Sequence, residues 1–250
     1  MHTIRMEEMT WPEVRTALKE GYATAIVGVG STEQHGPHLP TMTDARIADA
    51  VAERVARKLG KALVARTISV GCSHHHLAFG ATVSLRPDTL KAVVRDYVES
   101  LAEDGFSRIV FIPTHGGNFA PLAEAVAEAQ ATHSGLQVIG FTDFWALEGA
   151  LNRASAEFGI GAEEAGSHAG ENETSLMLTL EKDLVRTERY APGYLGPIGD
   201  DQFRAILKEG MPALTANGVL GDPRRASAEK GEAYLERWAD FLVREIAGKQ

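Results

Sequence analysis

The sequence contains a single cysteine, Cys72, so it has neither an internal disulfide nor a zinc site built from several thiolates. No apolar run approaches the roughly 20 residues that a membrane-spanning helix needs. Residues 1–11 lack the basic and apolar segments of a signal peptide. Asp and Glu number 34 against 25 Lys and Arg, and a net charge of −9 does not attract nucleic acid or anionic lipid. We therefore expect a cytoplasmic protein with no nucleic-acid or membrane partner.

The composition is that of a globular protein with a substantial core. Hydrophobic residues make up 44% of the chain and charged residues 24%. No Pro/Ser-rich linker, block of like charge or internal repeat divides it. For a chain of 250 residues, this predicts a single domain over residues 1–250.

Short apolar segments alternate with longer amphipathic ones along the whole chain. The apolar segments predict strands at 23–30, 63–70, 108–113 and 136–144, and the amphipathic ones predict helices at 44–59, 87–103, 119–132, 173–180 and 226–247. Residues 183–222 are richer in Gly and Pro, so we expect an irregular segment there. This alternation predicts the α/β class, with a mostly parallel sheet covered by helices on both faces.

Polar residues that suit catalysis gather in three Gly-rich segments: 30–40, 114–118 and 167–174. The first two directly follow predicted strands. In an open α/β sheet, ligands bind outside the carboxyl ends of the strands, so these two segments should meet there. Seven of the nine histidines lie in or beside such segments: His35, His38, His74, His75, His76, His115 and His168. The pattern predicts a polar site at one edge of the sheet.

The residue types at this edge favour a metal site. Imidazole and carboxylate without thiolate suit Zn, Mn or Fe(II). Glu33 and His35 are two positions apart, so on an extended segment they project to the same side. Asp44 could bridge two ions, and His115 would complete a site for one or two metals. Of the three histidines at 74–76, we expect at most one to touch metal or substrate.

Three other interpretations are weaker or stay open. Gly28 and Gly30 hint at a dinucleotide loop, but Glu33 occupies the third glycine position and would repel a pyrophosphate. A Cys-His hydrolase could use Cys72 with His74, although a buried structural cysteine is the more ordinary outcome. A non-catalytic protein that binds metal or a small ligand would need the same ligands, and the sequence leaves it open.

Four segments together resemble the creatininase (creatinine amidohydrolase) family: 30–40 with Asp44, 115–118, 168–175 and 218–231. The resemblance runs from about residue 8 to residue 245. It implies a three-layer α/β/α fold and metal-dependent hydrolysis of C–N bonds in small amides. The family includes amidohydrolases, a deformylase and a peptidase that acts on a small peptide. Its members are homo-oligomers, often hexamers, so the resemblance implies one here.

The resemblance also implies a ligand set. Glu33, Asp44 and His115 would hold one divalent ion, and His35, Asp44 and a further carboxylate would hold the second. In creatininase itself, the histidine after the third strand is followed by an aromatic residue and a metal-binding glutamate, whereas here Gly116 and Gly117 follow His115. The missing ligand must come from elsewhere. We expect Glu171, with Glu173 as the second choice.

The same two glycines put creatinine in doubt as the substrate, because an aromatic wall of its pocket is missing. They would also leave a roomier site beside the metals. The sequence reveals neither the amide that is cut nor which of Zn, Mn or Fe is used.

These residues suggest a mechanism. A hydroxide bridging two divalent ions would attack an amide, lactam or formamide carbonyl, and His168 would donate a proton to the leaving nitrogen. Glu171 joins the predicted catalytic residues. His76 and Glu173 are expected beside the ligands or the substrate, and Asn118 is expected to orient His115 or a metal-bound water. For His168, the competing interpretation is a cap on the following helix.

Overall fold

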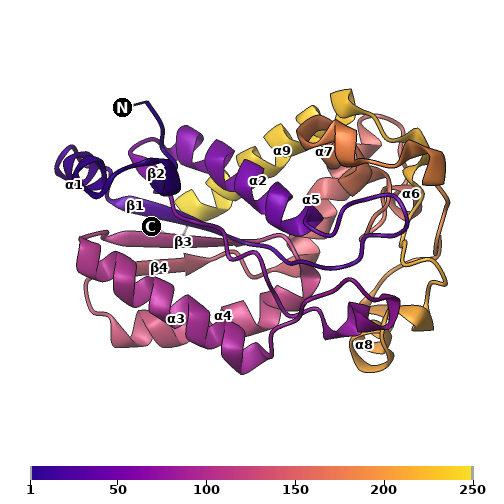
Figure 1. Ribbon diagram of the computed structural model, residues 1–250, viewed down its shortest axis with the longest axis horizontal. Helices are drawn as coiled ribbons and strands as arrows, with labels where there is room; N and C mark the ends of the chain where they lie inside the picture. The colour runs from indigo at the N-terminus through magenta and orange to yellow at the C-terminus, as the bar shows by residue number, and fades with distance from the viewer. Residues whose placement is uncertain (1, 249–250) are drawn as a thin grey trace.

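The computed structural model describes residues 2–248 (Figure 1). Its sheet contains four strands in the order β2-β1-β3-β4, and every neighbouring pair is parallel. The strands are β1 (Thr24–Val29), β2 (Ala62–Val64), β3 (Arg108–Pro113) and β4 (Gln137–Gly140). The predicted parallel sheet and the α/β class are confirmed.

Helices cover both faces of this sheet, which gives three layers (Figure 1). On one face α9 packs against α2, α5 and α7, and on the other α3 packs against α4. The α-helices are α1 (Trp11–Lys19), α2 (Thr43–Leu59), α3 (Pro87–Asp104), α4 (Phe119–Thr132), α5 (Phe144–Ala156), α6 (Ala162–Ala165), α7 (Glu171–Leu180), α8 (Asp200–Glu209) and α9 (Ala228–Ala247).

The apolar core consists of two clusters, one on each side of the sheet. Along β1, Ile26 belongs to the cluster under α2 and α9, whereas Ala25 and Val27 belong to the cluster under α3 and α4. A strand that is buried on both faces needs a nearly continuous apolar sequence, which residues 23–30 have. Burial on both faces holds the strand ends, and therefore the loops that follow them, in fixed positions.

The structure differs from the expected elements mainly at their boundaries. Strand β2 ends at Val64, and only Ile68 returns to the sheet edge as an isolated bridge to Val29. Strand β4 ends at Gly140, because Asp143 accepts a hydrogen bond from the Ala146 N–H and starts α5. Helices α1, α5 and α6 were not anticipated, and α8 lies in the segment expected to be irregular. That expectation is wrong for residues 200–209.

Strands β1 and β3 end side by side, with Val29 opposite Pro113. The pairing continues one residue further, since the Thr114 N–H donates to the Val29 carbonyl at 3.1 Å. Thr114 also donates its hydroxyl hydrogen to the Asp44 carbonyl at 2.8 Å, which ties the start of α2 to the same edge. The ends of β1 and β3 and the start of α2 therefore lie together at one edge of the sheet. Among residues 2–248, no helix combines the length and apolar character that crossing a membrane requires.

Candidate metal centre

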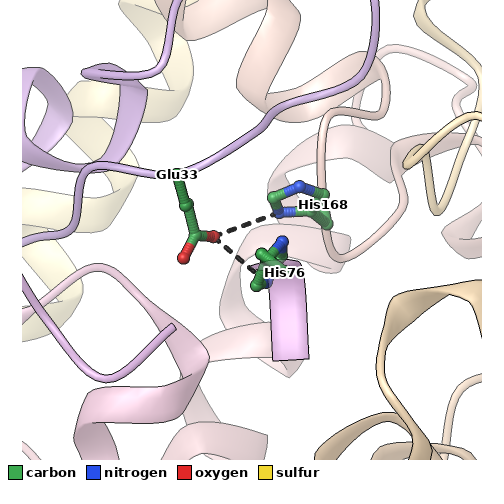
Figure 2. Close-up of side chains that lie close together, drawn as sticks. All are labelled: Glu33, His76 and His168. Carbon is green, nitrogen blue, oxygen red and sulfur yellow. Dashed lines mark ion pairs between the residues drawn. The ribbon is translucent and has the colours of Figure 1, made fainter. Parts of the chain in front are cut away.

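The carboxylate of Glu33 lies at the centre of a buried cluster of imidazoles. Its side chain is fully buried, and neither carboxylate oxygen has a hydrogen-bond partner. Three imidazole nitrogens face Oε1: Nδ1 of His115 at 3.1 Å, Nε2 of His76 at 3.2 Å and Nδ1 of His168 at 3.8 Å. Figure 2 shows His76 and His168 converging on this oxygen from separate segments. The predicted meeting of distant polar segments is thus present.

Asp44, in the first turn of α2, lies between two of the predicted histidine ligands. Its Oδ1 is 3.1 Å from Nε2 of His35, and its Oδ2 is 3.3 Å from Nδ1 of His115. The side chain is buried, and Oδ2 has no hydrogen-bond partner. A carboxylate that faces one imidazole with each oxygen is placed as a bridging ligand would be.

Backbone carbonyls orient both of these imidazoles. His35 donates from Nδ1 to the Glu33 carbonyl at 3.2 Å, and His115 donates from Nε2 to the Cys72 carbonyl at 3.1 Å. Each ring therefore carries its hydrogen on the nitrogen that faces the backbone. The opposite nitrogen faces the carboxylates and is the atom that each ring would offer to a metal ion. Metal-binding histidines are usually held in this way.

Gln34 sets different hydrogen positions on the two remaining imidazoles. Its backbone carbonyl accepts from Nε2 of His168 at 2.9 Å, which leaves the Nδ1 lone pair facing Glu33. Its side-chain amide donates to Nδ1 of His76 at 2.9 Å, so His76 carries its hydrogen on Nε2. The amide orientation is fixed because its oxygen accepts from the Gly36 N–H at 2.9 Å. His76 thus presents a hydrogen-bond donor to Glu33, whereas His168 presents an acceptor.

The cluster fits a metal ion by its chemistry. A buried carboxylate without hydrogen bonds is costly unless a cation compensates it. Within residues 2–248, three overlapping groups bring ligand atoms within 4.8 Å of one another. They are Glu33 with His35 and Asp44, His35 with His168 and Glu173, and Glu33 with His76 and His168. The donors are nitrogen and oxygen throughout, which is the set that Zn, Mn or Fe(II) accepts.

Opposing charges shift the protonation of these ligands. Burial by itself would lower the pKa of His35, but the carboxylates of Asp44 and Glu173 raise it to about 10. Burial would raise the pKa of Asp44, but His35 and His115 hold it below its usual range. Burial and nearby Asp44 raise the pKa of Glu173 to about 7, against the opposing effect of His35. The carboxylates likewise raise the pKa of His115 well above its usual value, so they draw positive charge to both imidazoles, as they would draw a cation.

The two glutamates of α7 have different surroundings. Glu171 accepts from Lys230 Nζ at 3.0 Å and from the Ser175 hydroxyl at 2.8 Å through Oε1, and from the Tyr234 hydroxyl at 3.0 Å through Oε2. It belongs to none of the three ligand groups found among the described residues. Glu173 lies 3.6 Å from Nε2 of His35 and belongs to one of those groups. The structure therefore places the second choice, Glu173, beside the cluster, and Glu171 beside α9.

The side chain of Asn118 reaches the cluster through Cys72, and its backbone N–H donates to the His115 carbonyl at 3.0 Å. Its Oδ1 accepts from the Cys72 N–H at 2.9 Å, and its Nδ2 donates to the carbonyls of Val29 and Gly30 at 3.2 and 2.9 Å. The Cys72 carbonyl is in turn the acceptor that orients His115. The Asn118 side chain thus joins the end of β1 to the segment that contains Cys72, and it thereby holds the carbonyl that orients His115.

Four further residues from the sequence analysis lie outside the ligand groups. His38 forms a hydrogen bond with Thr174 at 2.9 Å, and burial lowers its pKa to about 4. His74 is exposed, and His75 stacks on His115 with the ring centroids 5.5 Å apart. Cys72 is buried, and burial raises the pKa of its thiol, so the thiol is no activated nucleophile.

The competing interpretation of His168 as a helix cap finds no contact in the structure. Helix α7 has Gly170 at its N-cap, with no side-chain hydrogen bond there. Instead the ring of His168 packs between those of His35 and His76, at centroid distances of 4.2 and 4.6 Å. Burial, followed by the charge of His35, holds the pKa of His168 well below its usual value. The ring is therefore neutral in the structure and presents its lone pair to the cluster.

Three residues beside the cluster were not among the predicted site residues: Glu148, Phe144 and Phe203. A cavity of about 50 Å³, lined by Asp44, His115, Glu148 and Glu173 among others, lies directly against the cluster. Burial, and then the charge of Glu173, raise the pKa of Glu148 to about 8. Phe144 lines the same cavity and stacks on Phe203 of α8 at 5.0 Å. These residues come from helices that carry no motif, so the only available signal was their amphipathic spacing.

Comparison with known proteins agrees with this geometry. The sequence model of the creatininase family, described as creatinine amidohydrolase, matches residues 7–246. The chain belongs to the creatininase family. It is 32% identical to the mycofactocin precursor peptide peptidase of Mycobacterium ulcerans, over 95% of this chain and 86% of that one. It is also 32% identical to the creatinine amidohydrolase of Pseudomonas putida, over 92% of this chain and 90% of that one.

The fold of this creatininase-family chain also matches solved structures. A mutant creatininase described as the Zn-Zn type superimposes with a TM-score of 0.81 at 29% identity, covering 100% of this chain and 99% of that one. The expected family, fold and hydrolase class are therefore confirmed.

The two glycines that follow His115 have unequal surroundings. A Cβ on Gly116 would meet the rings of Phe144 and Phe203 at 3.5 Å, an ordinary contact distance across the cavity. A Cβ on Gly117 would overlap the Cys72 carbonyl and lie 2.7 Å from Nε2 of His115. Only Gly116 therefore leaves room beside the cluster. Because Gly117 has no side chain, its backbone can lie against the Cys72 carbonyl and the His115 ring, which form the hydrogen bond that orients His115.

Proposed function

We propose that this chain, acting as one domain, is a metal-dependent amidohydrolase that cleaves a C–N bond of a small amide, lactam or formamide. The observation that carries the proposal is the buried pair Glu33 and Asp44, whose unpaired oxygens face Nδ1 of His115, while the other Asp44 oxygen faces Nε2 of His35. Family membership supports it, because relatives include a creatinine amidohydrolase.

The geometry supports two ligand sets that share Asp44. Glu33, Asp44 and His115 would hold one divalent ion, and His35, Asp44 and Glu173 would hold the second. Glu173 replaces Glu171 in this proposal, because both oxygens of Glu171 are occupied by hydrogen bonds. When bound, such ions supply a Lewis acid for the carbonyl and lower the pKa of a water for attack. Zn, Mn and Fe(II) all suit these ligands.

His168 is the proposed proton carrier. Because its Nε2–H is bonded to the Gln34 carbonyl, its free lone pair on Nδ1 faces the cluster. A neutral imidazole in this state first accepts a proton, at Nδ1, and then delivers it to the leaving nitrogen. This order differs from the expectation that His168 begins as the acid. Asn118 and Cys72 keep His115 oriented, and Nε2 of His76 lies 3.2 Å from Oε1 of Glu33.

Metal content per chain tests the proposal first. Mass spectrometry should find close to two divalent ions in the wild type and fewer in His35→Ala and His115→Ala. His133→Ala is the matched control, because His133 lies on α4 and bonds to the Ala129 carbonyl. A protein that stays metal-free after reconstitution with Zn, Mn and Fe(II) would contradict the proposal. Saturating metal with no turnover across a broad amide panel would favour a binding protein without catalysis.

A peptidase is the second candidate. It is favoured by the relatives named mycofactocin precursor peptide peptidase and by a cleft larger than a lactam requires. We also propose a homo-oligomer, with a hexamer as the family's common form. Light scattering coupled to size-exclusion chromatography would measure the oligomeric state.

A further inference from the structure

The cavities that touch the metal cluster are too small for most of a substrate. Two cavities of about 50 Å³ each lie against His115 and His168. A water molecule needs at least 10–15 Å³ measured in this way, so each cavity holds a few waters or one planar functional group. The remainder of any larger substrate must lie elsewhere.

A larger cleft adjoins these cavities. Its volume is about 330 Å³, within the range of typical ligand sites. It shares Glu148, Gly166 and Ser167 with one small cavity, and Ser167, Ile198 and Leu220 with the other. Ser167 precedes His168 in the chain. The cleft is therefore the neighbouring space in which the rest of a substrate can lie when its carbonyl is at the cluster.

The lining of this cleft combines aromatic surface with negative charge. Trp145 and Tyr194 supply two aromatic side chains, and Trp145 is 40% exposed at the surface of α5. Glu148 and Glu163 are the two acidic residues of the lining, which contains no basic one. The pKa of Glu148 is raised to about 8, so its carboxyl group would lose its proton in favour of an ammonium group bound beside it. A carboxylate-bearing group would be repelled there, whereas an amine would be attracted and an apolar stem would bury surface.

We propose that this cleft binds one arm of the substrate, an arm of about the size of an amino-acid residue that bears a cationic amine. The substrate class is then an extended, amino-bearing amide rather than a small lactam such as creatinine. Glu148 and Glu163 are its specificity-determining residues. This inference rests on the proposed amidohydrolase function, because it places the scissile carbonyl at the metal cluster.

The test measures binding of L-phenylalaninamide and of N-acetyl-L-phenylalaninamide to the metal-loaded protein by calorimetry. These probes share the apolar stem and differ in the charge of the amine. The wild type should prefer the free amine by about tenfold. Glu148→Gln and Glu163→Gln should each remove most of this preference. Glu157→Gln, at the end of α5 but paired with Arg237, is the matched control and should retain it.

A third variant tests the location rather than the charge. Asn152 lines the cleft from α5, so Asn152→Trp should fill it and weaken both probes at least tenfold. Equal affinity for the two probes in the wild type, or an unchanged preference in both glutamate variants, would overturn the inference. Circular dichroism of each variant separates loss of binding from loss of fold.

Hydrolysis of a small amide separates this inference from the function on which it rests. Formanilide has no amine-bearing arm and should be cleaved at similar rates by the metal-loaded wild type and by the control Glu157→Gln, whose residue pairs with Arg237 outside the cleft. Formanilide turnover without any amine preference would overturn the inference alone. An amine preference without turnover of any amide would overturn the proposed function alone.

Discussion

Glu171 and Lys230 form an ion pair that joins α7 to α9, with Nζ 3.0 Å from Oε1. Glu171 is fully buried, and the side chain of Lys230 is 15% exposed. The Tyr234 hydroxyl bonds the second carboxylate oxygen at 3.0 Å. Glu171 thereby stabilises the contact between the two helices. Glu173, two residues later in the chain, instead lies 3.6 Å from Nε2 of His35.

Substitution of the two glutamates should separate these roles. Glu173→Gln removes an anionic ligand, so we expect metal content to fall by about one ion per chain and amide hydrolysis to fall at least tenfold. Glu171→Gln is the matched control. It should keep its metal but lose about 3 kcal/mol of unfolding free energy, because Lys230 keeps its charge and loses its ion-pair partner. Metal analysis and urea denaturation provide the two measurements. Loss of metal in Glu171→Gln with full metal content in Glu173→Gln would show that Glu171 is the ligand.

Metal binding should stabilise the fold, because Glu33 and Asp44 are buried with oxygens that lack hydrogen bonds. At a free metal concentration 100 times the dissociation constant, the expected gain is about 2.7 kcal/mol. Calorimetric scans with and without a chelator would measure it. Asp44→Asn should lose most of the gain, whereas Asp49→Asn on the same helix should keep it. An Asp44 variant with full metal content and activity would contradict the bridging role.

Much of the site could be predicted because it depends on strand ends. Parallel strands place their carboxyl ends at one edge, so Glu33 and His115 had to lie near each other once β1 and β3 were recognised as neighbours. Asp44 followed from its place at the start of an amphipathic helix. Buried apolar strands and Gly-rich loops are local signals, and they specify this part of the architecture.

The choice between Glu171 and Glu173 could not be made in this way. Two positions on a helix differ by about 200° of rotation, so the residues point to opposite sides. Which side faces the metals depends on how α7 packs against α9, a contact between distant segments. One local signal existed, because Ser175 lies four residues after Glu171 and is its hydrogen-bond partner.

Glu148 and the cleft were beyond local reasoning for the same reason. The cleft is assembled from α5, α6 and residues 194–198, and the sequence analysis assigned none of these an ordered element. Helix α8 does carry an amphipathic pattern, with Phe203 and Ile206 on its inner side and Gly210 at its end. The high Gly and Pro content of the surrounding residues obscured that pattern.

His38 should make the protein less stable in mild acid. Its pKa is about 4 in the folded state, mainly through burial and then through the charge of His35, against about 6.5 when unfolded. Below pH 6.5 the unfolded chain therefore binds a proton that the folded chain does not, and unfolding becomes easier as pH falls towards 4. The largest loss from this residue is about 3 kcal/mol.

Urea denaturation of wild type and His38→Gln between pH 7 and pH 4 would measure this loss. The other histidines titrate in both proteins and largely cancel in the difference. The free energies of unfolding should converge by about 3 kcal/mol as pH falls, because only the wild type has this titrating group. Curves that stay parallel would show that His38 is protonated in the folded protein, despite its burial beside Thr174 and the ring of Tyr190.

The paired glycines after β3 give a test of positioning that leaves every ligand in place. Gly117→Ala should displace the Cys72 carbonyl or His115, because the new Cβ overlaps the first and crowds the second. Disturbing the hydrogen bond that orients a metal-binding histidine typically costs 10–100-fold in metal affinity, and we expect a loss in that range. Gly116→Ala is the matched control, since its Cβ would make ordinary contacts with Phe144 and Phe203. Metal titration of both variants, with thermal unfolding to confirm the fold, should show a weakened site only in Gly117→Ala. Equal affinities would mean that His115 binds without help from the Cys72 carbonyl.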